Sequence, residues 1–320
     1  MMLLGRWIWM SVLLVGVAPA QTLSPFDFLR SAENSARAAG LGGAFVAYAG
    51  DASAQLYNPA TIPTTVDNSL SVTFTKHVLD INSGVAAYTR RLGSGWMGAS
   101  AAVTSFGTFT RTDGLGNTIG TFGAASIALA LSYANQFDTN AYYGITIGYV
   151  QTTIDRAAAS ALVTSVGILY QLPKIRTTLG ASVRYIGFQL ARMNGQDASL
   201  PTDVRLGVSH RLRGLPLLVS FNLARLAEER MSFAERLRNF TLGGELSLGT
   251  ALQLRVGYDN GVRSSQSSAT ASFLTGMGIG AGVILPGLTL DYTLTTLSAP
   301  AAVHRVSCGI ALDRVFAGAK

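Results

Sequence analysis

The chain has 320 residues, of which 48% are hydrophobic and only 13% are charged, and its formal net charge is +7. Its mean hydropathy of +0.33 is high for a soluble protein. However, no apolar run past the N-terminus reaches the ~18 residues that a membrane helix needs. The basic residues form no Lys/Arg run interleaved with aromatics, which argues against nucleic-acid binding. The composition therefore favours a β-structure whose apolar side faces lipid.

The first twenty residues have the pattern of a secretory signal. Arg6 supplies a positive charge, residues 8–17 are apolar, and Ala18-Pro19-Ala20 offers a small-residue cleavage site. The alternative, a membrane anchor, needs a longer apolar core. We expect residues 1–20 to be a signal peptide that directs export to the bacterial outer membrane.

Residues 21–68 lack the period-two pattern of the rest of the chain. The Ala-rich stretch 31–41 predicts a short helix that Gly42-Gly43 ends. The next stretch predicts capped turns of helix, because Asp51 and Ser53 are good N-caps and Asn58 precedes a proline. This motif comprises Asp51, Ser53, Asn58, Pro59 and Ala60. The segment is either a periplasmic tether or a plug inside a barrel, and its apolar composition favours the plug.

From residue 69 onward, period-two segments are joined in rotation by tight turns and by longer loops. The predicted strands are 69–77, 83–92, 96–106, 122–134, 141–153, 161–170, 175–189, 202–212, 215–224, 238–248, 251–260, 272–285, 287–296 and 303–312. Residues 107–120 and 154–160 are among the predicted loops. An even number of strands with all the short turns on one side is typical of outer-membrane barrels.

Charged residues fall on the face of these strands opposite to the bulky apolar residues. The pattern alone also fits a soluble two-sheet protein, whose apolar face would point inward. The signal sequence, the rotation of turn lengths and the hydropathy favour a membrane barrel. We therefore predict an all-β fold, a transmembrane antiparallel β-barrel over residues 69–312 with a short tail over 313–320. The residues expected to face its lumen are Arg184, Arg205, Glu245, Arg255 and Asp291.

Two loops are candidates for contact with partner proteins, because binding residues concentrate on loops. Residues 225–238 have the spacing of a short amphipathic helix or, alternatively, of a solvated mixed-charge loop. Residues 106–122 predict an extended hairpin with an exposed aromatic. The candidate contact residues are Phe109, Arg111, Asp113, Glu228, Met231 and Phe233.

The sequence marks no catalytic, cofactor or metal site. His77 and His304 are expected to be neighbours at the outer rim, but no serine with an oxyanion site accompanies them. Cys308 is the only cysteine, so neither an internal disulfide nor a cysteine-based metal site can form. We therefore expect a protein that is not an enzyme and that has no cofactor.

Several blocks of the chain resemble a known family in order and spacing. Gly42-Gly43-Ala44-Phe45-Val46-Ala47, Asp51-Ala52-Ser53-Ala54 and Asn58-Pro59-Ala60 are similar to the N-terminal block of the PorV/PorQ family and, more distantly, to the hatch of FadL-type long-chain fatty acid transporters. Further blocks, such as residues 80–84, 107–111, 238–245 and 254–260, favour the PorQ branch.

The resemblance implies a FadL-like barrel of fourteen strands in the outer membrane, attached to the type IX secretion system. Such a barrel would hold or shuttle surface proteins for cargo secretion and attachment to lipopolysaccharide. The alternative function is a FadL-like channel for hydrophobic small molecules, with residues 21–68 as its gate and a hydrophobic ligand or detergent in its lumen. A general porin is less consistent with an apolar N-terminal segment. Fold alone does not choose between the first two.

Overall fold

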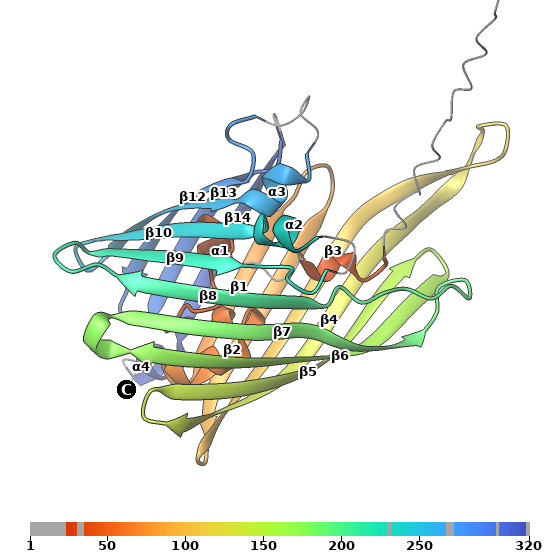
Figure 1. Ribbon diagram of the computed structural model, residues 1–320. Coiled ribbons are helices and arrows are strands. Elements are labelled where there is room, and N and C mark those ends of the chain that lie inside the picture. The colour runs from red at the N-terminus through yellow and green to blue at the C-terminus, as the bar shows by residue number, and fades with distance from the viewer. Residues whose placement is uncertain (1–23, 31–34, 229–231, 267–271, 299–300, 318–320) are drawn as a thin grey trace, which may run out of the picture.

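The computed structural model describes residues 24–30, 35–228, 232–266, 272–298 and 301–317. In this part of the chain, strands β1 to β14 hydrogen-bond in sequence order and close into a barrel, because β1 pairs with both β14 and β2 (Figure 1). The pairing is antiparallel, as Ser69 opposite Ala311 and Lys76 opposite His304 illustrate. The prediction of an all-β, fourteen-stranded transmembrane barrel is confirmed. The predicted signal peptide lies outside the described residues.

The strands have the following bounds: β1 Ser69–Lys76, β2 Asn82–Leu92, β3 Gly95–Thr112, β4 Thr118–Asp138, β5 Ala141–Ile154, β6 Ala157–Leu172, β7 Thr177–Ala191, β8 Asp203–Arg211, β9 Leu217–Leu223, β10 Phe240–Leu248, β11 Leu252–Asp259, β12 Met277–Leu285, β13 Leu288–Thr296 and β14 Ala302–Ala311. Short helices outside the lumen are η4 Pro173–Ile175, α2 Phe233–Leu237, α3 Asn260–Ser264 and α4 Leu312–Ala317.

Bulky apolar side chains cover the outside of the barrel. On β11, Leu254 and Val256 are 42% and 51% exposed, whereas Arg255 between them is 2% exposed. Ile147 on β5 and Leu290 on β13 are exposed in the same way. An apolar exterior around a polar interior is the arrangement of a lipid-embedded barrel and the reverse of a soluble one. No helix among the described residues is long and apolar enough to cross a membrane.

The two ends of the barrel differ in their connections. At one end, here called the tight-turn end, the strands are joined by short links such as 93–94, 139–140 and 286–287. The other end, called the long-loop end, carries the loops 192–202, 224–239 and 260–276 and the long β3–β4 hairpin (Figure 1). This separation is the one that the sequence predicts.

Two of the predicted loops are wrong in extent, although residues 106–122 do form the extended hairpin that the sequence also predicts. Residues 107–120 are mostly strand, because β3 and β4 continue past a bulge after Ser105 and leave only 113–117 as a turn. Residues 154–160 contain only the two-residue link 155–156 between β5 and β6. In both regions Gly, Thr and Ala carry little side-chain pattern, so the backbone pairing extends beyond the alternation that marks a strand.

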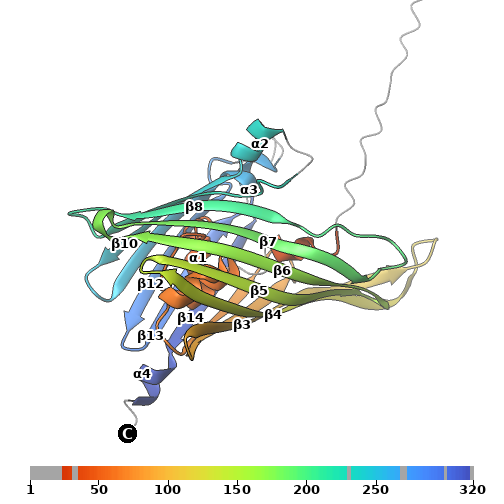
Figure 2. The same ribbon diagram turned by 60° about the horizontal axis from the view of Figure 1, so that its bottom comes forward.

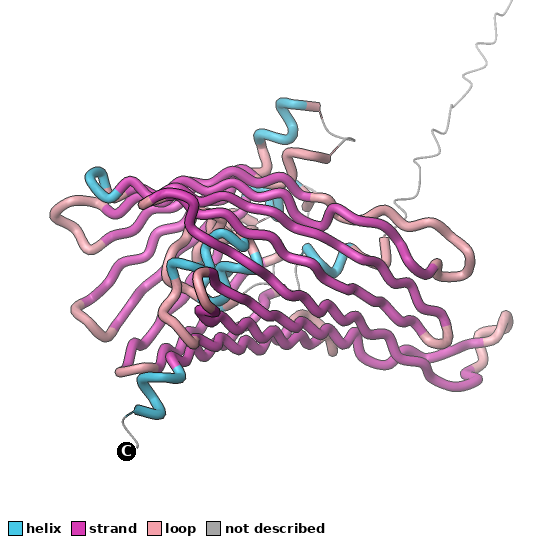
Figure 3. The backbone as a smooth tube through the Cα atoms, turned by 90° about the horizontal axis from the view of Figure 1, so that it is seen from below, coloured by secondary structure: helices cyan, strands magenta, loops and turns pink. Residues whose placement is uncertain are grey.

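Residues 35–64, here called the inner segment, lie inside the barrel (Figures 2 and 3). They form α1 (Ala36–Gly40), η2 (Ala52–Leu56) and η3 (Pro59–Thr64), and η1 (Asp27–Arg30) precedes them. The helix α1 packs on β11 to β14, whereas η3 packs on β3 to β6. Aromatic residues of the segment, including Phe45 and Tyr57, are buried in the main hydrophobic cluster. The barrel core is therefore the inner segment together with the wall around it.

Candidate functional site

Glycines of the wall let the inner segment approach the strands closely. A Cβ atom built on Gly144 of β5 would lie 2.5 Å from the carbonyl carbon of Pro59. One built on Gly180 of β7 would lie 2.5 Å from the carbonyl oxygen of Val46. Real Cβ atoms do not approach backbone so closely. The strand glycines thus provide the space in which the inner segment rests.

The motif residues predicted in 51–60 hold the turns of this segment. Asp51 caps η2 by accepting a hydrogen bond from Ser53 N at 2.8 Å. Asn58 is fully buried and caps η3, since its Oδ1 accepts from Ala60 N at 3.0 Å. The Asn58 Nδ2 atom donates to the Val46 and Ile168 carbonyl oxygens at 3.0 and 2.9 Å. Asn58 therefore joins two parts of the inner segment to strand β6.

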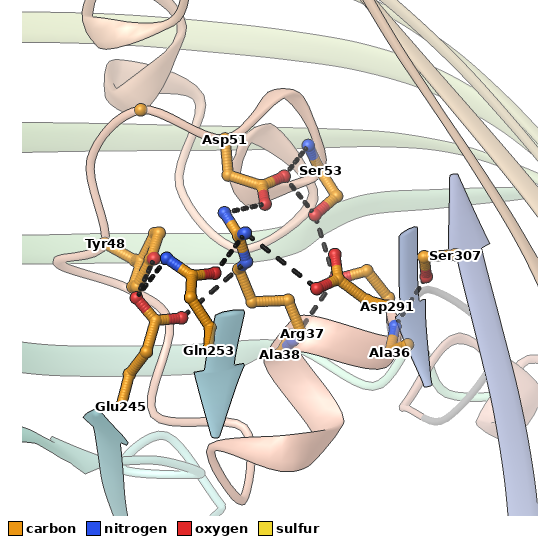
Figure 4. Close-up of polar contacts among 12 residues, drawn as sticks. Ala36, Arg37, Ala38, Tyr48, Asp51, Ser53, Glu245, Gln253, Asp291 and Ser307 are labelled. Atoms are coloured by element: carbon orange, nitrogen blue, oxygen red, sulfur yellow. Dashed lines mark hydrogen bonds and ion pairs between the residues drawn. The ribbon is translucent and has the colours of Figure 1, made fainter. Parts of the chain in front are cut away.

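A buried ionic cluster ties α1 to the wall on which it packs (Figure 4). Arg37 of α1 lies among three carboxylates: its Nη1 is 3.2 Å from Asp51 Oδ2, its Nε is 3.7 Å from Glu245 Oε2, and its Nη2 is 3.9 Å from Asp291 Oδ1. The Arg37 Nη2 atom also donates to Gln253 Oε1 at 2.8 Å. One cation of the inner segment thus faces residues of β10, β11 and β13.

The wall contributes its own cation to this cluster. Arg255 donates from Nε to Glu245 Oε2 at 2.7 Å and from Nη1 to Asp291 Oδ1 at 2.6 Å. The Tyr48 hydroxyl donates to Glu245 Oε1 at 2.9 Å. Burial raises the pKa of Tyr48 above its ordinary value, against the opposing charge of Arg37, so the phenol stays protonated at neutral pH. The cluster has two guanidinium groups and three carboxylates, all shielded from solvent.

A second group of cations surrounds Tyr57 nearer the long-loop end. The guanidinium carbons of Arg184 and Arg205 lie 5.6 and 5.4 Å from the centre of the Tyr57 ring, within cation–π range. Arg205 pairs with Asp203 at 2.6 Å. The predicted lumen-facing residues therefore separate into two groups: Glu245, Arg255 and Asp291 meet, whereas Arg184 and Arg205 lie around Tyr57.

Small cavities border the inner segment on both sides. Cavities of about 70 and 30 Å³ flank Tyr57, the first lined by Arg205 and the second by Arg184. At the tight-turn end, a cavity of about 160 Å³ reaches Arg37 and Asp51, and another of about 440 Å³ lies beneath Tyr48. A drug-sized ligand needs ~300 Å³ or more. The two spaces beside Tyr57 are smaller than that.

The candidate partner-contact residues are distributed over the long-loop end. Phe109 stacks on Phe122 across the β3–β4 hairpin with ring centres 5.4 Å apart, and Arg111 pairs with Asp155. Asp113 holds the hairpin turn by accepting from Leu115 N and Asn117 N at 2.9 and 2.8 Å.

The other contact candidates lie in the loop 224–239. The short-helix alternative is confirmed by α2, whose Ser232 and Glu235 form a capping box. Phe233 on this helix is 73% exposed. Glu228 instead approaches Arg30 of η1 at 3.7 Å. Met231 lies outside the described residues.

His77 and His304 each form a local hydrogen bond near the long-loop end. His77 Nε2 hydrogen-bonds Ser83 Oγ at 2.9 Å, and His304 Nδ1 hydrogen-bonds Tyr292 Oη at 2.8 Å. Burial, with help from Arg305, lowers the pKa of His77 to about 4, so its imidazole is neutral at pH 7. In the described part of the chain no group of His, Cys, Asp or Glu side chains has the arrangement of a metal site.

Arg37 is the functional candidate that sequence reasoning missed. Its one signal is that it is the single basic residue of the Ala-rich stretch 31–41. Its partners come from positions 14 to more than 200 residues away, and the strand pattern does not indicate which lumen residue would meet the inner segment.

Solved structures with similar folds include monoaromatic hydrocarbon channels. The chain is similar to the CymD monoaromatic hydrocarbon channel, with a TM-score of 0.58 and 12% identity over 85% of this chain and 95% of that one. It is also similar to the Pseudomonas putida toluene transporter TodX, with a TM-score of 0.55 and 12% identity over 87% and 96% of the two chains. A third similar structure is a Pseudomonas aeruginosa FadL homologue, with a TM-score of 0.52 and 12% identity over 87% of this chain and 98% of that one.

These similarities establish the fold. The chain is a FadL-like barrel, as the resemblance in its N-terminal blocks implies. No protein-family model and no curated protein matches the sequence. The expected relation to the PorV/PorQ family and to type IX secretion therefore stays a prediction.

Proposed function

We propose that this protein is an outer-membrane channel for hydrophobic small molecules, in which the inner segment is the gate. The observation that carries the proposal is the buried contact between the inner segment and the wall, through Arg37 and Asn58. These polar contacts hold the segment in one place. They also bury charged groups, whose desolvation cost is offset only while the groups stay paired. A segment held by a few such contacts can move as a unit when they break.

The similar solved structures support this choice of substrate class. Their names describe channels and a transporter for monoaromatic hydrocarbons and toluene. In the proposed orientation the tight-turn end faces the periplasm and the long-loop end faces the outside, as in other outer-membrane barrels. Residues 1–20 would be the signal that directs export. The surrounding partners would be outer-membrane lipid and lipopolysaccharide.

Uptake by intact cells tests the proposed transport. Cells that express the protein should take up radiolabelled toluene faster than cells with an empty vector, whereas uptake of a labelled disaccharide of larger size and high polarity should be equal in both. Equal toluene uptake in the two strains would overturn the proposal. Faster entry of both solutes would indicate an open porin instead.

A second function is supported by the exposure of α2. The helix projects from the long-loop end (Figure 2), and Phe233 presents an exposed aromatic side chain that could anchor a surface protein of a secretion complex. Pull-down from outer membranes with Phe233→Ser and with the matched Phe273→Ser, another exposed aromatic of this end, tests it. A partner lost only with Phe233→Ser would support the scaffold function, and no specific loss would reject it.

A further inference from the structure

The tight-turn end of the barrel carries a group of four cations that form no ion pair with a carboxylate in the described part of the chain. Lys174 and Arg176 lie in the β6–β7 turn that contains η4, and Arg211 and Arg213 lie at the end of β8 and just after it. The two turns touch: Arg211 N donates to the Arg176 carbonyl oxygen, and Arg213 Nη2 donates to the Lys174 carbonyl oxygen, both at 3.0 Å. Among the described residues, none of these four side chains belongs to an ion pair.

Two of the four cations line an open cavity. The cavity of about 440 Å³ at this end is lined by Arg176 and Arg211 together with Tyr48, Gln171 and Ser209. Ser209 faces the lumen, since its hydroxyl donates to the Ala47 carbonyl oxygen of the inner segment at 2.8 Å. The cavity is therefore the end of the lumen beneath the inner segment. We call the cavity and its four cations the basic vestibule; its η4 turn is seen at the left of Figure 1.

Two exposed cations at the opposite end of the barrel form ion pairs. There, Arg111 pairs with Asp155, and Arg192 pairs with Asp197 at 2.8 Å. Four like charges held in two adjacent turns repel one another and create a positive potential. The cations of these two pairs are compensated within the chain, whereas the four cations of the basic vestibule are in no ion pair of the described residues and are open to an acidic ligand.

We propose that the basic vestibule binds an acidic peptide segment of a protein on the tight-turn side, which is the periplasm in the proposed orientation. The ligand must extend over the rim, because Arg176 and Arg211 line the cavity whereas Lys174 and Arg213 lie on the exposed turns. An extended chain advances ~3.3 Å per residue, so alternate carboxylates are spaced to reach both positions. A small solute in the lumen would meet only the inner two cations. This proposal does not depend on the transport function.

The experiment uses the full-length protein in nanodiscs of zwitterionic lipid and a fluorescent octapeptide of alternating Glu and Ser. Fluorescence anisotropy should show binding that weakens as salt is raised. Arg211→Gln and Arg176→Asn should each raise the Kd about threefold and together about tenfold, as expected for exposed ion pairs. Asn is chosen at position 176 because its backbone has φ +53, a conformation that Asn tolerates.

Arg90→Gln is the matched control, because Arg90 is an exposed cation on β2 at the same end but outside the basic vestibule. Its Kd should stay within about twofold of the wild-type value. Heat-modifiable migration on gels will verify that each variant is folded. The proposal is overturned if the peptide does not bind, if the double variant binds like the wild type, or if Arg90→Gln weakens binding equally.

Two competitors distinguish other sources of negative charge. Hexanoate at the same carboxylate concentration should not displace the peptide. The protein in nanodiscs that contain anionic phospholipid should bind the peptide with an unchanged number of sites. Full displacement by hexanoate would assign the cations to a small solute. Loss of peptide sites in anionic discs would assign them to lipid head groups. Either result would contradict the peptide proposal.

Discussion

Arg37 decides the charge balance inside the barrel. Its removal would leave Arg255 alone among Asp51, Glu245 and Asp291, all of which are largely withdrawn from water. Buried charges that lose a partner retain their desolvation cost without the compensating attraction. Of the two cations in the cluster, Arg37 is the one that belongs to the inner segment. Its removal therefore weakens the contact between this segment and the wall.

We predict that Arg37→Met destabilises the folded protein by about 3 kcal/mol, the lower range for breaking a buried ion pair. Adding Asp51→Asn should recover part of the loss, because it removes one of the uncompensated carboxylates. The measurement is the urea midpoint for unfolding from lipid vesicles. Arg90→Met, at an exposed position, is the control and should change the midpoint little. An Arg37→Met midpoint equal to that of the control would show that the cluster contributes nothing.

At the scale of the element, the strands could be predicted from the sequence and their contacts with the inner segment could not. Alternation in Leu252 to Asp259 marks a strand and its two faces, because the side-chain period is two residues. The same signal fails at 107–112 and 157–160, where small residues and threonines hide the pattern. The inner segment has no period that relates it to the wall. Its position depends on side-chain pairs far apart in sequence, such as Arg37 with Glu245.

Close packing at the wall glycines gives an element-scale prediction. Gly144→Ala would place a methyl carbon only 2.5 Å from the carbonyl carbon of Pro59. We expect η3 to shift and the protein to lose about 1–3 kcal/mol, as overpacked cores do. Gly84→Ala on β2 is the matched control, because a Cβ there would meet nothing within 4 Å. Thermal loss of the compact gel form compares the two, and equal transition temperatures would show that η3 does not press on β5.

The whole molecule is organised by two contrasts, outside against inside and one end against the other. Apolar residues face outward and paired charges face inward, which suits lipid around the barrel. The ends differ in loop length, which gives the barrel a direction. The sequence predicts the first contrast and the difference in loop length. The grouping of four cations in the basic vestibule depends on which turns lie next to each other.

Lipid contact can be measured with a single tryptophan. In a Trp96→Phe variant, which leaves no tryptophan after residue 20, Ile147→Trp should be strongly quenched by brominated lipid, because Ile147 is 54% exposed on the outside of β5. Leu115→Trp at the tip of the β3–β4 hairpin, where Leu115 is 89% exposed, should not be quenched. Equal quenching at both positions would be inconsistent with a barrel embedded as proposed.

Locking the inner segment to the wall tests the gated channel most directly. A Cβ atom built on Gly207 lies 3.1 Å from the Val46 Cβ, near the distance of about 3.5–4.5 Å that a disulfide joins. Val46→Cys with Gly207→Cys, in a Cys308→Ser background, should form a bond in the oxidising periplasm. The account predicts that toluene uptake then falls to that of cells without the protein and returns, on reduction, to the level of the Gly207→Cys single variant, which is the baseline because its new Cβ already meets Asn222 Oδ1 at 2.3 Å. Undiminished uptake with the bond formed would contradict it.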